Sequence, residues 1–387
     1  MIRAELPEGH CDVVNMQTAL EKLDWYEALD GEEQKSFLEA NDLQREAVQA
    51  ARKGDFESAL ADLNDVQSQY ALLNTPPCDE TIVLQLSRSH LLILCSRPKE
   101  AVLAASTAQR LAIAADGELS PSVIKCLCVL NKAYIETGDM IGAARAICSA
   151  CRICSAFDDE VQFEYVECLL DATSTFLKVD DLSRAQACLD KASGSLDNDG
   201  TAPPATRREA LARRVLNSRA VLDMQQHKYE SALQKADEYL KATTNKADRA
   251  FAQRVKGAIL LKMGKTDEAR DIIYEAADLT SAHVCPSLRA AESTIYAAML
   301  TVDGRLREAM DLLENQISQV EAAAGKEHPV LDRLLRHYAK ALGAAGRNED
   351  AHSADQRAKK VKDAIQAMRA TIESDKECKL PWEERPD

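Results

Sequence analysis

The stretch Met263-Gly264-Lys265-Thr266-Asp267-Glu268-Ala269-Arg270 decides the fold of this chain. It predicts a helix that ends, a turn at the glycine, and a second helix with an alanine five residues after the turn. The same pattern occurs eight times, at Ala59, Ala101, Ala143, Ala185, Ala232, Ala269, Ala309 and Ala351, in steps of 42, 42, 42, 47, 37, 40 and 42 residues. A fixed period of this length with helix–turn–helix content is typical of a solenoid.

Two positions in the pattern have a physical reason. The turn positions are expected near residues 54, 96, 138, 180, 227, 264, 304 and 346, and glycine occupies five of these eight. A helix that stops and reverses needs a residue with positive φ just past its end, which glycine adopts most easily. The alanine is expected at a close crossing of two helices, where only a small side chain lets the backbones approach to ~8 Å.

The pattern resembles the tetratricopeptide repeat, a helical hairpin that usually has a shorter period, ~34 residues. It is most similar to the long repeats of the kinesin-light-chain type. The last copy has His328-Pro329-Val330 at its start, then Tyr338-Ala339, and Gly346-Arg347 with Asp350-Ala351 at its turn. The resemblance covers residues ~41–374 and implies a right-handed superhelix whose first helices line a concave groove that binds a partner.

We therefore expect an all-α, right-handed α-solenoid of about eight hairpins with capping helices at both ends. Residues 1–40 are expected to form a tail and a capping helix, and residues 41–374 the solenoid. Residues 193–204 are expected to be a lengthened surface loop inside the 47-residue step. Residues 375–387, which include Trp382 between two prolines, are expected to be a flexible tail.

Composition excludes several classes of protein. The net charge is −15, which argues against direct nucleic-acid binding. No apolar run approaches the ~18 residues of a membrane helix, and the first residues lack the apolar core of a signal sequence. We expect a cytoplasmic protein that does not insert into a membrane.

Two stretches of the sequence resemble sites that bind phosphate or a metal ion, but neither supports that function. Gly264-Lys265-Thr266 resembles the end of a phosphate-binding loop, but Ile259 stands where that motif needs a further glycine. The chain has 12 cysteines, and Cys148, Cys151 and Cys154 lie three apart on one expected helix. Such thiols could hold zinc or copper, but at this spacing we interpret them as core residues. We expect no enzyme activity, no cofactor and no metal.

The function expected from these features is that of a scaffold or adaptor that binds a peptide or helix of another protein in the groove. The alternative is a permanent subunit of a larger multiprotein or ribonucleoprotein assembly, packed through its convex face or its edges. At the 48 positions that the resemblance places on the groove, basic residues outnumber acidic ones by eleven to three, although the whole chain has 48 basic and 63 acidic residues. The partner is therefore expected to be acidic or phosphorylated.

The candidate partner-binding residues lie on the expected first helices of the hairpins. They are Lys125, Lys132, Arg214, Asn217, Arg254, Lys262, Arg333, Arg336 and Lys340. Arg333, Arg336 and Lys340 are spaced by three and four residues, so they share one helix face. Ile295 and Val255 are expected to add apolar contacts with the partner.

Overall fold

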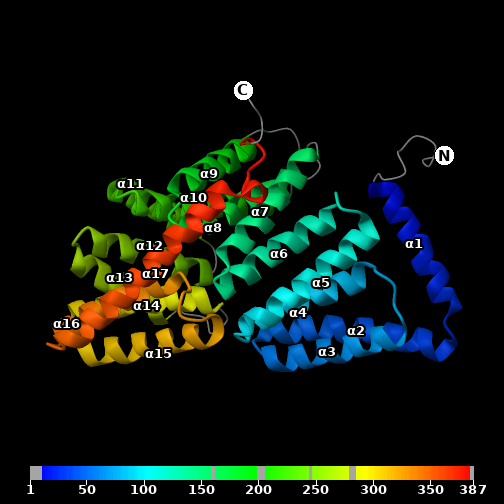
Figure 1. Cartoon of the computed structure of the whole chain (residues 1–387), viewed down its shortest axis with the longest axis horizontal. Coiled ribbons are helices and arrows are strands. Elements are labelled where there is room, and N and C mark those ends of the chain that lie inside the picture. The colour runs from blue at the N-terminus through cyan, green and yellow to red at the C-terminus, as the bar shows by residue number, and fades with distance from the viewer. Residues whose placement is uncertain (1–10, 158–161, 198–204, 244–245, 279–284, 384–387) are drawn as a thin grey trace.

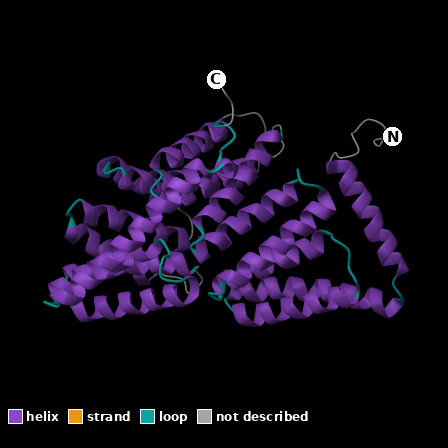
Figure 2. Ribbon diagram, in the orientation of Figure 1, coloured by secondary structure: helices purple, strands orange, loops and turns teal. Residues whose placement is uncertain are grey.

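The computed structural model describes residues 11–157, 162–197, 205–243, 246–278 and 285–383 (Figure 1). In these ranges the chain forms helices and loops and no strand (Figure 2). The helices are α1 (Cys11–Ala28), α2 (Gly31–Lys53), α3 (Phe56–Leu72), α4 (Asp79–Leu94), α5 (Pro98–Asp116), α6 (Pro121–Thr137), α7 (Met140–Ala156), α8 (Gln162–Lys178), α9 (Leu182–Asp197), α10 (Ala205–Gln225), α11 (Tyr229–Ala242), α12 (Lys246–Lys262), α13 (Thr266–Asp278), α14 (Pro286–Val302), α15 (Leu306–Ala324), α16 (Val330–Ala344) and α17 (Asn348–Ser374), followed by a short 3-10 helix, Lys376–Cys378.

The helices pair into hairpins along the chain. After α1, each even-numbered helix packs against the odd-numbered helix that follows it, from α2 with α3 to α16 with α17. We call the even-numbered partner the first helix of its hairpin and the odd-numbered partner the second. The predicted all-α solenoid of helical hairpins is confirmed.

The turns show why the repeat needs its glycines. All eight turn positions have a left-handed backbone, with φ between 58° at Asp180 and 95° at Gly54. In seven of the eight turns, the amide after the turn residue donates a hydrogen bond to the carbonyl oxygen five residues earlier, as Lys265 does to Leu260 at 3.0 Å. This hydrogen bond can form at the end of a helix only when the turn residue, which directly precedes the donor, adopts positive φ. Ser96, Asp180 and His227 adopt it without being glycine.

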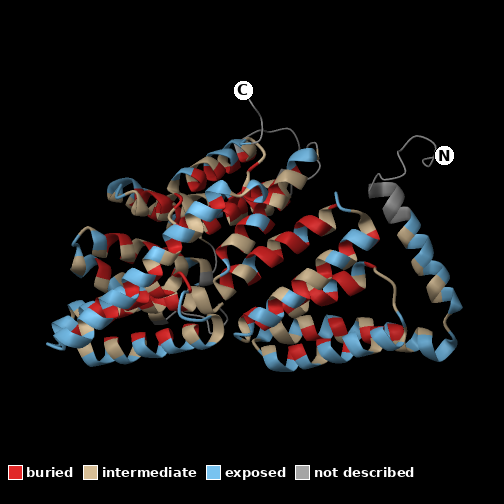
Figure 3. Ribbon diagram, viewed as in Figure 1, coloured by how far each residue is buried: buried red, intermediate tan, exposed pale blue. Residues whose placement is uncertain are grey.

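The repeated alanine lies in the contact between helices. Seven of the eight copies have no exposed surface, and Ala351, in the last hairpin, is partly exposed. Buried positions follow one side of each helix, where it faces its neighbours (Figure 3). Gly257 on α12 was not singled out from the sequence, yet a Cβ there would lie 2.5 Å from Ile273 Cγ1. Close approach of α12 and α13 therefore depends on two small residues, Gly257 and Ala269.

The hairpins stack so that the first helices form one continuous layer. Each first helix contacts the next first helix all the way from α2 to α16, whereas successive second helices have no comparable contact. A stack whose one layer is tighter than the other must curve toward the tighter layer. We call the side of the first helices that faces away from the second helices the inner face.

The curvature brings the seventh and eighth hairpins back against the third. The carboxylate of Glu136, at the end of α6, accepts hydrogen bonds from the amide and hydroxyl of Ser287 on α14, at 3.0 and 2.5 Å. His328 Nε2 donates to the carbonyl oxygen of Ile135 at 2.9 Å. Gly138 leaves room for this histidine, because a Cβ there would lie 3.1 Å from the ring. Each hairpin therefore contacts the next along the stack, and in addition the seventh and eighth hairpins contact the third.

The C-terminal segment differs from the prediction of a flexible tail. Helix α17 runs back across the molecule toward α7 and α9 (Figure 1), and residues 375–383 pack against α7 and α9. Cys378 and Leu380 are fully buried, and Arg152 Nη1 donates to the carbonyl oxygens of Glu377 and Lys379 at 3.0 and 2.9 Å. Residues 375–383 therefore have a packed position, which sequence periodicity does not indicate because Arg152 lies 225 or more residues from the carbonyl groups that it binds.

The N-terminal helix packs only in part. Trp25 lies edge-on to Phe37, with ring centroids 5.2 Å apart, so the end of α1 covers α2 as a cap would. Leu20 and Leu23 are each 50% exposed, so this part of α1 leaves apolar side chains uncovered, unlike a helix that caps with its whole length. The predicted loop at 193–204 begins later than expected, since α9 extends to Asp197, and its residues 198–204 lie outside the described ranges.

Candidate functional site

The structure sorts the candidate groove residues into paired and unpaired cations. Lys132 and Arg214 lie on α6 and α10, and both bind Asp171 on α8 between them, at 3.5 and 2.7 Å. Their three helices are consecutive first helices, so these ion pairs run along the inner face. Arg336 binds Asp332 on its own helix at 2.8 Å. These three cations already have a carboxylate partner within the chain.

Arg254 does not lie where a partner could contact it. Its side chain is 10% exposed and forms an ion pair with Glu292 on α14 at 2.5 Å. Burial lowers the pKa of Arg254 and raises the pKa of Glu292. The charge of each residue moves the pKa of the other in the opposite direction. The pair borders a cavity of about 140 Å³ that Ile295 also lines. Arg254 is therefore part of the packing between α12 and α14 rather than of an exposed groove.

Two further predicted contact residues are also less accessible than expected. Val255 is 8% exposed, so it contributes to the core instead of to a partner contact. Asn217 on α10 is partly buried, and its Oδ1 is buried without a hydrogen-bond partner. Spacing placed these residues on the correct helices but could not fix how far each helix is rotated.

Four candidate cations are exposed and have no ion-pair partner in the described part of the chain. They are Lys125 on α6, Lys262 on α12, and Arg333 and Lys340 on α16. Three of these influence one another. The pKa of Lys262 is lowered mainly by burial and then by the charges of Lys340 and Arg333. The structure thus brings together charges that are 71 or more positions apart in the sequence.

Two residues on the same side of the molecule extend this basic region. His337 lies between Arg333 and Lys340 on α16, and burial together with Lys340, Lys262 and Arg333 lowers its pKa to about 4. The pKa of Lys178 on α8 is lowered mainly by burial, and the charge of Arg333 lowers it further. His337 was not found from the sequence, because a neutral histidine adds nothing to a charge count.

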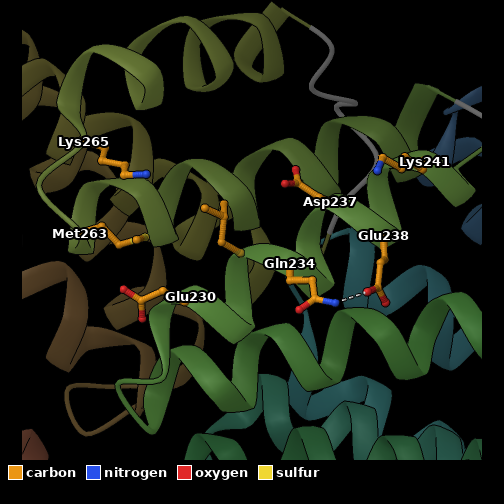
Figure 4. A pocket seen from close by; sticks show the side chains of 8 residues that line it. Glu230, Gln234, Asp237, Glu238, Lys241, Met263 and Lys265 are labelled. Carbon is orange, nitrogen blue, oxygen red and sulfur yellow. Dashed lines mark hydrogen bonds between the residues drawn. The ribbon is translucent and has the colours of Figure 1, made fainter.

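A larger hollow lies away from the inner face. Its volume is about 490 Å³, and it is lined by one side of α11 and by Met263 and Lys265 at the α12–α13 turn (Figure 4). Glu230, Asp237 and Glu238 make its surface acidic, and Gln234 donates to Glu238 at 2.9 Å. The hollow has few apolar residues and no nucleophile beside a base, so it lacks the features of a typical ligand or catalytic site.

The cysteines pack as core residues. Cys148, Cys151 and Cys154 are buried, and burial raises the pKa of the Cys148 and Cys151 thiols. Cys168 lies 3.4 Å from Cys128 and 3.8 Å from Cys154, measured between sulfur atoms. Across the described ranges, no three His, Cys, Asp or Glu side chains are placed to hold a metal ion. Gly264-Lys265-Thr266 forms a repeat turn at the end of α12, with no strand before it.

The fold is similar to that of several solved structures. The chain matches the apo form of the quorum sensor NprR from B. thuringiensis with a TM-score of 0.55 and 13% identity, over 90% of this chain and 93% of that one. It matches a Rap protein complexed with competence and sporulation factor at 0.54 and 14%, over 86% and 99% of the two chains. It matches a Rap conjugation gene regulator in complex with a Phr peptide at 0.55 and 12%, over 88% and 98%. These identities show a shared helical-repeat fold.

Sequence comparison adds no family to this result. No protein-family model matches the chain, and no curated protein matches it significantly. Among the helices that the structure describes, none is long and apolar enough to cross a membrane.

Proposed function

We propose that this protein is a non-catalytic scaffold or adaptor that binds an acidic or phosphorylated peptide segment of a partner protein on its inner face. The observation that carries the proposal is the continuous layer of first helices, on which Lys125, Lys262, Arg333 and Lys340 have no ion-pair partner among the described residues. Unpaired cations on a curved, partly desolvated surface raise the local potential, which speeds capture of an anionic segment.

The similar structures support the peptide part of the proposal. Two of the three hold a signalling factor or peptide, namely competence and sporulation factor and a Phr peptide. This chain shares the helical-repeat fold of both structures, and we propose that it uses its hairpins in a comparable way. The long repeat with its His328-Pro329 pair supports a repeat of the kinesin-light-chain type. We also propose a cytoplasmic role without membrane insertion. Since the chain is acidic overall, the proposed role does not involve direct binding to nucleic acid.

The test is a capture from native cell extract, followed by binding measurements on the partner so identified. Arg333→Glu/Arg336→Glu/Lys340→Glu is compared with Lys99→Glu/Arg110→Glu/Lys228→Glu, in which the three exposed cations lie on second helices or beside them. The first variant should bind at least about tenfold more weakly and show less salt dependence, because several charged contacts are reversed. Equal affinity of the two variants would place the partner on another surface.

A second candidate function follows from a different surface. In the described residues, exposed large apolar side chains are concentrated near the N-terminal end: Leu20, Leu23, Leu38, Leu72, Val83, Leu103, Ile113 and Leu119. Val302 on α14 is the ninth such residue in the described ranges, so eight of the nine lie on or beside α1–α5. Exposed apolar side chains that gather on one surface are typical of a region that another protein covers. This favours the alternative of a permanent subunit, attached through the N-terminal edge of the solenoid. Gel filtration separates the two functions, because a groove binder should be monomeric alone and a permanent subunit should self-associate or precipitate.

A further inference from the structure

Three of the unpaired cations form a cluster, which we call the cation cluster: Lys262, Arg333 and Lys340. Lys262 is the last residue of α12, and the other two lie on α16, two hairpins further along the stack. The contacts of α12 with α14 and of α14 with α16 hold the three helices together in one layer. All three side chains are exposed, so they reach the surface of that layer instead of its core.

The acids around the cluster are already engaged elsewhere. Asp332, one residue before Arg333, binds Arg336 at 2.8 Å. Glu136 accepts both of its hydrogen bonds from Ser287, and Asp171 binds Lys132 and Arg214. Lys178 lies close to Arg333, but the charges of Glu136 and Asp171 also act on it, and its Nζ donates to Ser174 Oγ at 2.9 Å. Among the described residues, Lys262, Arg333 and Lys340 therefore have no carboxylate in an ion pair with them.

A cluster of like charges destabilises the folded state. Like charges held near one another on a partly desolvated surface repel each other, and each would gain from a counter-ion. Burial is the main cause of the lowered pKa of Lys262 and of His337, and the repulsion between the like charges lowers both pKa values further. Elsewhere the chain pairs its cations readily, as in the contacts of Arg207 with Glu164 at 2.9 Å and of Arg219 with Asp190 at 2.7 Å. Residues that destabilise the folded state, and whose cost no other contact in the structure offsets, are characteristic of functional sites.

We propose that the cation cluster is an anion-binding subsite that takes a compact oxyanion of the bound partner, either a phosphoryl group or two adjacent carboxylates. The subsite rests on the proposed function, since the oxyanion belongs to the segment held on the inner face. Arg333 offers the planar, forked donors that match an oxyanion in two contacts, and the two lysines act as point charges beside it. His337, neutral at pH 7, lies on the same helix between them and can donate one further hydrogen bond.

The experiment uses the full chain and two defined probes, inorganic pyrophosphate and triglutamate, in titration calorimetry at low salt. Lys262→Gln/Arg333→Gln/Lys340→Gln is compared with the outer control Lys99→Gln/Arg110→Gln/Lys228→Gln, which loses the same charge. The inner variant should bind at least about tenfold more weakly than wild type, because three charge-assisted contacts are lost. The outer control should bind as wild type does. The probe that binds more tightly to wild type identifies phosphoryl or carboxylate as the preferred source.

The melting temperature without a probe is the second measurement. Since the inner variant removes mutual repulsion, its melting temperature should equal or exceed that of wild type. A lower melting temperature, equal weakening by both variants, or no binding of either probe up to millimolar concentration would each overturn the subsite. If the subsite fails while the captured partner still crosslinks to the inner face, the proposed function stands without it.

Discussion

At the residue scale, the fold depends on positions that allow only one kind of side chain. The turn residue must adopt positive φ, and the alanine five residues later must be small. Three turns use Ser96, Asp180 or His227 instead of glycine. Asp180 has a further contact that offsets its backbone cost, since its carboxylate binds Lys362 and its carbonyl oxygen accepts from Arg369 at 2.9 Å. The non-glycine turns are therefore not equivalent.

The first prediction concerns the repeated alanine. Ala143→Leu or Ala269→Leu should lower the free energy of unfolding by roughly 1–3 kcal/mol, because both sites have no exposed surface and an added isobutyl group would overpack the helix contact. Ala351→Leu is the matched control, since Ala351 occupies the same repeat position and is partly exposed. Denaturant unfolding measures all three. A loss at Ala351 as large as at Ala269 would contradict the packing given for the repeat.

Some of the residues on which the fold depends can be predicted from the sequence, and others cannot. The turn positions and the alanines recur with a fixed period, so a single sequence exposes them. Gly257 does not recur, and only the 2.5 Å approach of Ile273 shows its role. The burial of Arg254 against Glu292 was equally hidden, because a charge count cannot tell a paired cation from a free one.

At the scale of elements, the C-terminal segment is held by one surface of α7 and α9. Arg145 binds Asp375 at 2.7 Å, Arg184 binds Glu383 at 3.0 Å, and Lys191 lies 5.0 Å from the centroid of the Trp382 ring. The sequence favoured a flexible end, since residues 375–383 have no helical period. Their order comes from contacts between elements, which local pattern cannot encode.

The second prediction tests this docking. Arg152→Ala removes two hydrogen bonds from a charged donor to the carbonyl oxygens of Glu377 and Lys379, so amide exchange of residues 376–383 should accelerate. The local stability should fall by roughly 1–3 kcal/mol, the range for a lost charged donor. Hydrogen exchange read by mass spectrometry reports it, with Arg110→Ala on α5 as the control. Unchanged exchange would mean that Cys378 and Leu380 hold the segment without Arg152.

The third prediction concerns the thiols of α6–α9. Burial raises the pKa of Cys126 to about 12, and the Cys148 and Cys188 thiols are shifted upward by the same cause. A thiol reagent at pH 8 should therefore label these cysteines slowly in the folded protein and rapidly in denaturant. Helical circular dichroism should be unchanged by a chelator. Unfolding on chelation, together with stoichiometric zinc, would show that the cluster holds a metal.

At the scale of the whole molecule, closure of the solenoid makes stability sensitive to pH. Burial lowers the pKa of His328, which bonds the eighth repeat to Ile135, and also that of His90 and His337. Each histidine is therefore easier to protonate in the unfolded chain. Because the unfolded state binds more protons below about pH 6.5, the free energy of unfolding should fall as the pH drops from 6.5 toward 4.

The fourth prediction isolates one of these histidines. His337 titrates beside Lys262, Arg333 and Lys340, and its pKa in the folded state is about 4. His337→Gln should reduce the loss of stability between pH 7.5 and pH 5 by roughly 2 kcal/mol, since glutamine takes no proton in either state. Urea unfolding at the two pH values measures this. An identical pH dependence in wild type and variant would mean that His337 is not desolvated in the folded protein.

The whole molecule also shows how far sequence reasoning reaches. The period predicts the number of hairpins and the layer of first helices, because each repeat has the same local physics. The return of α17 and residues 375–383 onto α7 and α9, and the contact of Glu136 with Ser287, depend on the accumulated curvature of the stack. Curvature follows from many small rotations between repeats, which a single sequence does not give. The sequence could therefore name candidate cations of the groove, but it could not show which of them have a carboxylate partner.

The central claim is that a partner segment binds the inner face, and site-specific photo-crosslinking tests it most directly. A photoreactive residue is placed at Lys125 on the inner face of α6 or, as the control, at Arg110 on α5; both positions are exposed. With the partner captured from extract, crosslinks should form from position 125 and not from position 110. Crosslinks from position 110 alone would contradict the account and place the partner on the second helices.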